Sequence, residues 1–228
     1  MSIKAIFLDF YGTVVHEEEA SLVEICHKIK AKSDTAASAL EIGYDWMKEF
    51  NQLLSHSHGE NFLKQRDLSA TSLRNTLTKF KSNANEDELL ELMFHHWKSP
   101  TIYNDAVEFF EKNNLPIFIL SNVDHLDITE AINLLHLKVD GIITSEHVKA
   151  YKPHQDMFEY ALNQNGFSPE EVLHVGDSLT SDVSGANQVG INSVWLNRSN
   201  KPLSGDSKPD YIINNLNELL DLPVLVKI

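Results

Sequence analysis

The sequence predicts an α/β fold: an open, Rossmann-like parallel sheet with an inserted all-helical cap. After residue 100, short apolar runs of strand length alternate with helical segments, which is typical of a parallel sheet covered by helices on both faces. One more strand-like run lies at the N-terminus. The roughly 80 residues between that run and residue 100 show only helical periodicity.

The predicted sheet begins with residues 3–9, a short apolar run that ends at a glycine turn. Five further runs follow, at 115–122, 139–145, 171–177, 191–197 and 210–214. Helices are expected between most of them, at 105–113, 124–136, 153–165 and 181–189. Pro153 suits the first position of its helix, and Gly166 suits the position just past its end. Ser168 and Glu171 have the spacing of a capping box.

The predicted cap consists of amphipathic helices. Within residues 17–30, the apolar side chains share one helix face: Leu22, Ile25, Cys26 and Ile29. Residues 34–54 and 85–98 repeat this period, and the polar residues 55–61 between them resemble a turn. We therefore predict a core formed by residues 1–15 and 100–228, and a helical cap formed by residues 16–99.

Composition excludes several classes of function. The 228 residues are 42% hydrophobic and carry a formal charge of −14, which repels nucleic acid and anionic membranes. The single cysteine, Cys26, excludes an internal disulfide and a cysteine-based zinc cage. The neighbouring histidines in the sequence do not share a helix face, so no zinc site is expected. No apolar run reaches about 18 residues and no secretory leader is apparent, so a cytoplasmic protein is expected.

The polar residues of interest follow the predicted strands. Asp9 ends the first strand, Ser121 and Asn122 end the second, and Asp177 ends the fourth. Lys152 follows the third strand, and Asp182 lies in the first turn of the next helix. Ligands of open parallel sheets bind at the carboxyl ends of the strands. These acids, the lysine, the hydroxyl and the amide are therefore expected to meet in one crevice.

These motifs resemble the haloacid dehalogenase-like hydrolase superfamily of the helical-cap type, most of whose members are Mg²⁺-dependent phosphatases. The resemblance lies in four segments in order, "DFYGTV" at residue 9, "LSN" at 120, "YKP" at 151 and "GDSLTSD" at 176. Each segment alone is a weak signal, but four in order at strand ends make a strong one. The cap matches only in length and helicity.

The resemblance implies a role for each matching residue. Asp9 would be the nucleophile that forms an aspartyl-phosphate. Ser121 and Asn122 would bind the phosphoryl oxygens, with Gly12 and Thr13 also at the substrate. Lys152 would neutralise negative charge on Asp9 and on the transferred group. Mg²⁺ would be held by Asp9, Asp177 and the backbone carbonyl of Tyr11, with Asp182 orienting these ligands.

Tyr11 departs from the phosphatase pattern. Superfamily phosphatases usually carry an aspartate there, two residues after the nucleophile, as general acid and base. A tyrosine, with an ordinary pKa of about 10, donates a proton at neutral pH but is a poor base. The first motif of 2-haloacid dehalogenases commonly reads Asp-x-Tyr-Gly-Thr, and the halide leaves without a proton. That branch works without metal and holds the substrate carboxylate with a cap arginine, for which this chain offers Arg66 and Arg74.

The first segment, with Tyr11, thus favours a dehalogenase, whereas the fourth segment, with Asp177, favours a metal-dependent phosphatase. We give more weight to Asp177, because three carboxylates without a cation would disfavour one another's ionisation. The prediction is a Mg²⁺-dependent phosphatase of a small, phosphorylated and therefore anionic metabolite, with Tyr11 as a catalytic side chain. The alternatives are a metal-free 2-haloacid dehalogenase and a catalytically weakened member that binds a ligand or a partner. Monomer and homodimer both remain open, because the apolar run 222–228 suits either an edge strand or an interface.

Overall fold

The computed structural model describes residues 2–17 and 19–225, and its centre is a six-stranded parallel sheet. The strand order is β3-β2-β1-β4-β5-β6, with every neighbouring pair parallel. The strands are β1 (Ala5–Leu8), β2 (Ile117–Ser121), β3 (Gly141–Thr144), β4 (Val172–Gly176), β5 (Asn192–Leu196) and β6 (Tyr211–Ile213). All six lie within the predicted runs, so the α/β prediction is confirmed.

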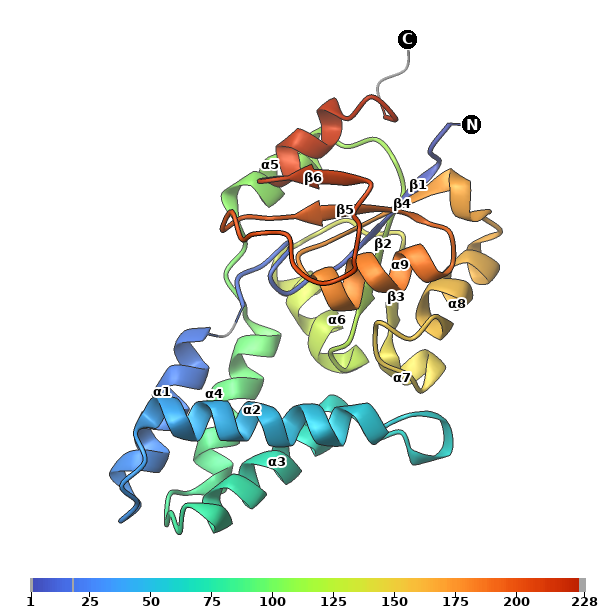
Figure 1. Cartoon of the computed structure of the whole chain (residues 1–228). Coiled ribbons are helices and arrows are strands. Elements are labelled where there is room, and N and C mark those ends of the chain that lie inside the picture. Colours follow the sequence, from blue (N-terminus) through green and yellow to red (C-terminus); the bar gives the residue numbers. More distant parts are fainter. Residues whose placement is uncertain (1, 18, 226–228) are drawn as a thin grey trace.

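Helices cover both faces of the sheet (Figure 1). One face packs against α5 (Asn104–Lys112), α6 (His125–Leu134) and the 3₁₀ turn η4 (Leu216–Asp221). The other face packs against α8 (Asp156–Asn165) and α9 (Gly185–Gln188), which the π-helical turn η3 (Leu179–Ser184) precedes. The central strands are buried on both faces, which explains why their sequences are continuous apolar runs.

The cap helices lie together, beside the sheet (Figure 1). They are α1 (Glu19–Ala31), α2 (Ala39–His56), α3 (Gln65–Lys79) and α4 (Glu86–Lys98), with the 3₁₀ turn η1 (Gly59–Asn61) between α2 and α3. Their apolar faces form a hydrophobic cluster separate from the two clusters of the sheet, centred on Ile25, Trp46, Leu73 and Trp97. Val123 of the core also joins this cluster. The inserted helical cap is thus confirmed, and its exact limits stay a prediction.

Helix α3 is missing from the sequence prediction. Its buried face combines leucines with small hydroxyl residues at Ser69, Ser72 and Thr76, which obscure the apolar period. Two of these hydroxyls are hydrogen-bonded: Ser72 accepts a bond from Trp46 Nε1 of α2 at 3.0 Å, and Thr76 donates to the Ser72 carbonyl at 2.8 Å. Hydroxyls paired in this way can be buried at little cost.

The helix predicted to begin at Pro153 begins later, at Asp156. The preceding residues form turns, and the Asn122 side chain accepts a bond from the Lys152 backbone N–H at 2.8 Å. The His154 N–H donates to the Tyr151 carbonyl at 2.9 Å and closes a turn before the helix, so the prediction for the first turn is wrong. The helix ends as predicted at Gly166, whose φ is +68°. The predicted capping box of Ser168 and Glu171 is present.

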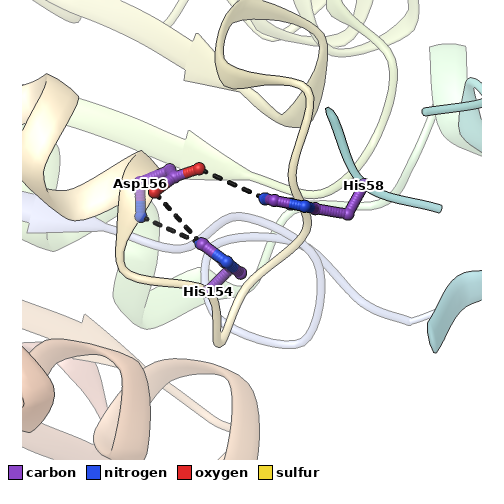
Figure 2. A group of neighbouring side chains, drawn as sticks. All are labelled: His58, His154 and Asp156. Carbon is purple, nitrogen blue, oxygen red and sulfur yellow. Dashed lines mark hydrogen bonds and ion pairs between the residues drawn. The ribbon is translucent and has the colours of Figure 1, made fainter. Parts of the chain in front are cut away.

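Cap and core contact each other beyond the linkers. Asp124, which precedes α6, accepts bonds from the backbone N–H groups of Gln65 at 2.8 Å and Arg66 at 3.0 Å, and so caps α3. The loop between α2 and α3 contacts the core loop 149–156 through a backbone bond from Gly59 to Lys149. At this contact His58 of the cap lies beside His154 and Asp156 of the core (Figure 2).

The C-terminal run 222–228 is partly described. Residues 223–225 form turns, and Leu222, Val224 and Leu225 pack against the sheet. Residues 226–228 lie outside the described residues, as do residues 1 and 18. No helix in the described part of the chain combines the length and apolarity needed to span a membrane.

A buried strand position should be far more sensitive to truncation than an exposed helical one. Leu173 of β4 is fully buried, whereas Leu126 of α6 is 70% exposed. We expect Leu173→Ala to lower the free energy of unfolding by about 2–5 kcal/mol. The same change at Leu126 should alter it by less than about 0.5 kcal/mol. Urea unfolding followed by circular dichroism measures both, and equal losses would contradict the assigned core.

Candidate active site

Three neighbouring strand ends bring the candidate residues together. Asp9 directly follows β1, Ser121 ends β2 and Asp177 directly follows β4. Since β1 lies between β2 and β4, and all three are parallel, their carboxyl ends meet at one edge of the sheet. A cavity of about 490 Å³ opens there. Its walls include most of the predicted site residues: Asp9, Tyr11, Ser121, Asn122, Lys152, Asp177 and Asp182.

Gly12 and Thr13 do not line this cavity. Gly12 has a φ of +85°, and a Cβ there would lie 2.9 Å from the Asp177 carboxylate, so the loop needs glycine to pass behind that side chain. Its N–H donates to the Val15 carbonyl at 2.8 Å. Thr13 is fully buried, and its carbonyl accepts a bond from Arg198 at 2.7 Å. Both residues thus shape the loop that follows Asp9, and the Thr13 side chain does not line the cavity.

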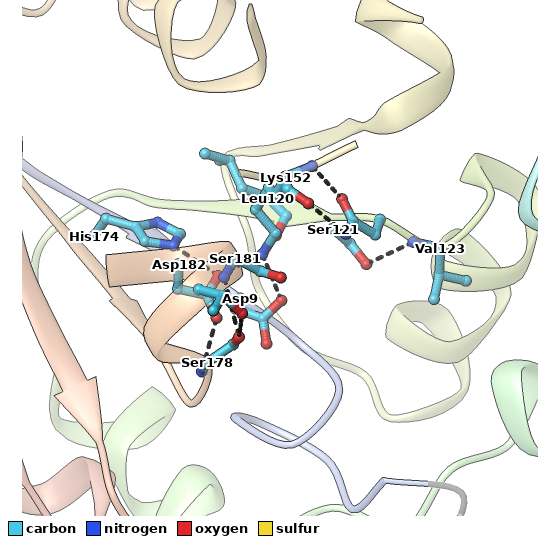
Figure 3. A network of polar contacts seen from close by, with 11 residues as sticks. Asp9, Leu120, Ser121, Val123, Lys152, His174, Ser178, Ser181 and Asp182 are labelled. Atoms are coloured by element: carbon cyan, nitrogen blue, oxygen red, sulfur yellow. Dashed lines mark hydrogen bonds and ion pairs between the residues drawn. The ribbon is translucent and has the colours of Figure 1, made fainter. Parts of the chain in front are cut away.

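The Lys152 ammonium joins the acidic side chains (Figure 3). Its Nζ donates to Asp9 Oδ1 at 2.7 Å, to Asp182 Oδ1 at 2.6 Å and to the Leu120 carbonyl at 2.9 Å. All three of its protons therefore have an oxygen partner, which a buried ammonium requires. The lysine side chain is only 2% exposed, so these ion pairs are shielded from water.

Asp182 is the best-paired carboxylate of the site. His174 Nε2 lies 3.0 Å from the oxygen that Lys152 contacts, and the Ser178 backbone N–H donates to the other oxygen at 3.1 Å. Burial alone would raise the pKa of Asp182, but Lys152 and His174 outweigh it and hold that pKa below its usual range. For Lys152, burial opposes the charge, yet the two carboxylates outweigh burial and raise the pKa of the ammonium.

Asp9 and Asp177 are less well compensated. Burial raises the pKa of Asp9, and the negative charge of Asp182 raises it further. Lys152 lowers the pKa of Asp9 but offsets this rise only in part, because the same ammonium also pairs with Asp182. Burial, together with the charges of Asp9 and Asp182, raises the pKa of Asp177 to about 8. Carboxylate oxygens of these three acids lie within 4.8 Å of one another. One ammonium among three acids leaves an excess of negative charge, which a cation would neutralise.

Gly176 allows Asp182 to reach this position. A Cβ at residue 176 would lie 2.2 Å from the Asp182 Cγ, closer than any real contact permits. The glycine that ends β4 is therefore needed for the close approach of the carboxylate to the strand. Asp177 is held from the other side, where Trp195 Nε1 donates to its backbone carbonyl at 2.9 Å.

Ser121 and Asn122 occupy different parts of the wall. The Ser121 side chain is 2% exposed, and its Oγ accepts a bond from the Val123 N–H at 3.2 Å, which fixes it at the cavity. The Asn122 side chain contacts the backbone of Lys152 on both sides, accepting from its N–H at 2.8 Å and donating to its carbonyl at 3.4 Å. Asn122 therefore positions the lysine loop.

Tyr11 connects the site to the cap. Its hydroxyl donates a hydrogen bond to the backbone carbonyl of Trp97 in α4. Its ring packs edge-on against Phe10 at 5.2 Å between centroids. The phenol proton is thus directed at the cap backbone in this arrangement, which places Tyr11 at the contact between the two parts of the molecule.

Sequence reasoning missed several residues of the site. His174 lies within a predicted strand, where a histidine is expected to be part of the buried core, and only the fold brings it next to Asp182. Glu17 and Lys201 both line the cavity. Partial burial raises the pKa of Glu17; Lys201 opposes this rise, and Asp9 adds to it. The position of Glu17 shortly after the first motif was the available signal.

The cap arginines are engaged elsewhere. The Arg66 guanidinium makes two bonds to Asp127, at 2.7 and 2.5 Å, and lies over the Phe94 ring. Arg74 pairs with Glu86 on the surface. Neither arginine lines the cavity, whose cationic side chains among the described residues are Lys152 and Lys201.

Residues 3–190 match the haloacid dehalogenase-like hydrolase family. The chain belongs to this family of hydrolases. Over nearly its whole length, this haloacid dehalogenase-like hydrolase is 26% identical to (S)-2-haloacid dehalogenase 4A of Burkholderia cepacia, covering 99% of the chain and 96% of the relative. It is 23% identical to N-acylneuraminate-9-phosphatase of Rattus norvegicus, covering 99% and 94%.

A shorter match is more similar in sequence. Over 89 residues the hydrolase is 36% identical to glyceraldehyde 3-phosphate phosphatase of Methanocaldococcus jannaschii, a match that spans 39% of each chain. Among solved structures, the magnesium-bound HAD-hydrolase YfnB from Bacillus subtilis has a TM-score of 0.77 at 18% identity, covering 99% of both chains. Relatives of this hydrolase therefore include both phosphatases and dehalogenases, and the structural neighbour shares the whole fold.

The raised pKa of Asp177 predicts a pH-dependent stability when divalent cations are removed. An unfolded aspartate has a pKa of about 3.9, so the folded protein binds this proton more tightly than the unfolded chain. The stabilising contribution is complete below about pH 4 and is lost as the pH rises to about 8. We expect Asp177→Asn, which mimics the neutral form, to be more stable than wild type at pH 9 by at least about 1 kcal/mol.

Urea unfolding in EDTA at pH 5, 7 and 9 measures the difference in free energy of unfolding between Asp177→Asn and wild type, which should shrink towards pH 5. The control is Asp221→Asn, a change at an exposed position of η4 that should give the wild-type profile at every pH. Parallel pH profiles of wild type and Asp177→Asn would contradict the charge excess assigned to the site.

Proposed function

We propose that this hydrolase is a Mg²⁺-dependent phosphatase that acts on a small phosphorylated metabolite through an aspartyl-phosphate on Asp9. The observation that carries the proposal is the convergence of Asp9, Asp177 and Asp182 on one cavity with a single buried ammonium. An anionic substrate enters such a cavity only if cations compensate the carboxylates. No nucleic acid or membrane surface is proposed as a partner, and a cytoplasmic location is proposed.

The donor set fits Mg²⁺, which prefers carboxylate and carbonyl oxygens and keeps several waters. Asp9, Asp177 and the backbone carbonyl of Tyr11 would hold the ion. Asp182 is already occupied by Lys152, His174 and Ser178, so it would act through its neighbours. When bound, Mg²⁺ would neutralise charge on the phosphoryl oxygens and in the cavity.

Asp9 would open the reaction by attacking phosphorus. An Oδ–P bond forms, the ester P–O bond breaks, and the alcohol leaves as it takes up a proton. Water then hydrolyses the aspartyl-phosphate, releasing phosphate and restoring the carboxylate. Lys152 fixes the orientation of Asp9 through Oδ1 and stabilises the negative charge that gathers there. Ser121, held by the Val123 N–H, would donate its hydroxyl proton to a phosphoryl oxygen.

Glu17 is our candidate for the proton transfer that an aspartate at position 11 would otherwise perform. It lines the cavity with Asp9, and its raised pKa favours the protonated acid that a leaving alkoxide needs. Tyr11 instead would hold the cap to the site through Trp97. We propose the cap limits as residues 16–99, and closure of this cap would exclude water from the reaction.

A metal-free 2-haloacid dehalogenase is the second candidate function. Two observations favour it. The Tyr11 hydroxyl is directed at the Trp97 carbonyl, and a dehalogenase does not need this hydroxyl because halide leaves without a proton. A relative that matches over nearly its whole length is named as a dehalogenase. The placement of Arg66 on Asp127 counts against it, because no arginine among the described residues lines the cavity to hold a substrate carboxylate.

Removal of the nucleophile tests the proposal directly. With 4-nitrophenyl phosphate and Mg²⁺, we expect Asp9→Asn to lower phosphate release at least about 10³-fold, and EDTA to abolish the wild-type rate. Asp221→Asn should keep the wild-type rate. Chloride release from 2-chloropropionate that is unaffected by EDTA would instead establish the dehalogenase. Tight ligand binding without turnover in either assay would favour a catalytically weakened member.

Substitution of Glu17 should depend on the leaving group. An alkoxide needs a proton, whereas 4-nitrophenolate leaves without one, so Glu17→Gln should slow the best alkyl phosphate about 10²-fold or more and 4-nitrophenyl phosphate much less. Steady-state kcat/KM for both substrates measures the split, because it reports the step in which the leaving group departs and not the later hydrolysis of the aspartyl-phosphate. The control is Glu24→Gln, at an exposed position of α1 that pairs with Lys28. An equal effect of Glu17→Gln on both substrates would contradict the role.

A further inference from the structure

A second group of metal-ligating side chains lies away from the candidate active site, where the cap contacts the core. His58 comes from the loop between α2 and η1, and His154 and Asp156 come from the core loop and the first residue of α8. Figure 2 shows the three side chains pointing toward one another across the gap between these segments. His58 and His154 are distant in the sequence, so no spacing motif could reveal this group.

The two segments are held in place by bonds that do not involve the histidines. The Gly59 N–H donates to the Lys149 carbonyl at 2.9 Å. On the same loops, the Tyr151 hydroxyl donates to the Leu63 carbonyl at 2.7 Å, and the Tyr151 ring lies 5.2 Å from that of Phe62. The position of His58 opposite His154 is therefore preorganised, which lowers the cost of assembling a ligand set.

The distances suit a small cation. His58 Nε2 lies 3.4 Å from Asp156 Oδ2, and His154 Nδ1 lies 3.2 Å from Asp156 Oδ1. One ligand atom from each residue lies within 4.8 Å of the other two, and the imidazole rings stack with centroids 4.3 Å apart. Ligands bound tetrahedrally to Zn²⁺ at 2.0–2.1 Å are separated by about 3.4 Å, so small side-chain rotations would complete the geometry.

The donor types indicate which cation would bind. Two imidazole nitrogens and one carboxylate suit Zn²⁺ and similar transition metals, whereas Mg²⁺ prefers oxygen ligands. The side chains are 51%, 43% and 37% exposed for His58, His154 and Asp156, so an ion can enter and a water can supply a fourth ligand. The Asp156 N–H lies 3.4 Å from His154 Nδ1, a long contact that a metal bond would replace.

We propose that His58, His154 and Asp156 bind a divalent transition-metal cation of the Zn²⁺ type, which clamps the cap loop 57–63 to the core loop 149–156. Lys152 lies in that core loop, two residues before His154. The bound cation would add a metal–ligand link to the contacts of Gly59 and Tyr151 and so restrain opening of the cap. The proposal depends on residues outside the candidate active site, so its test is independent of the proposed reaction.

Zn²⁺ binding can be measured by competition with a chromophoric zinc indicator. All proteins carry Asp177→Asn, which removes one carboxylate from the acidic cluster at the other candidate cation site. On this background we expect one equivalent of Zn²⁺ to bind, and His58→Ala and His154→Ala each to weaken binding at least about tenfold. The matched control is His56→Ala, two residues away, where the imidazole hydrogen-bonds to Gln52 and Ser55 of its own helix.

Equal affinity in His58→Ala and in its parent, or an equal loss in His56→Ala, would overturn the site. The clamp has a separate readout, amide hydrogen exchange of the peptide covering residues 57–63. Zn²⁺ should slow this exchange at least about tenfold in the parent and in His56→Ala, but not in His58→Ala. Unchanged exchange in a parent protein that has bound Zn²⁺ would overturn the clamp.

Discussion

The ion pairs of Lys152 with Asp9 and Asp182 are the constraint on which the rest of the site depends. A buried ammonium is tolerated only when each of its protons finds an oxygen. Here the oxygens come from the residue after β1, from β2 and from the turn after β4. The strand order β2-β1-β4 supplies these oxygens at neighbouring positions. Asn122 completes the arrangement by holding the Lys152 backbone, so four separate segments of the chain must be in register before the charges can be satisfied.

The same arrangement leaves an excess of negative charge, because one ammonium faces three carboxylates. Asp182 is the best compensated of the three acids, through the ion pair with Lys152 and the contact with His174, whereas Asp9 and Asp177 are less well compensated. A structural site would have fewer acids, because each uncompensated carboxylate lowers stability. The excess is intelligible if the cavity holds a cation and an anionic group together, and this is the physical basis for the proposed Mg²⁺-dependent phosphoryl chemistry.

The cap takes part in the site through polar contacts as well as shape. Tyr11 reaches from the nucleophile loop to the Trp97 carbonyl, and Asp124, after β2, caps the first turn of α3. Each contact joins a residue within a few positions of the catalytic groups to a cap helix. Movement of the cap would therefore shift the loops that position Asp9 and Ser121. The group at His58 and His154 lies on the same junction, close in sequence to Lys152, and its nitrogen ligands distinguish it from the all-oxygen cluster of the cavity.

The sequence by itself determined the α/β class, the six strands, the helical insertion and the strand-end positions of Asp9, Ser121 and Asp177. These follow from local period and from the rule that parallel strands present their carboxyl ends at one edge. It missed α3, whose buried hydroxyls hide the apolar period, and it misplaced the start of α8, which follows a turn closed by Tyr151 and His154. Only the tertiary structure could decide the partners of His174, Tyr11, Arg66 and His58. Tyr11, Arg66 and His58 each meet a residue at least 61 positions away in the sequence, and such long-range pairs leave no periodic or spacing signal in the chain. His174 and Asp182 are close in sequence, but they meet only because the turn after β4 folds back against the strand.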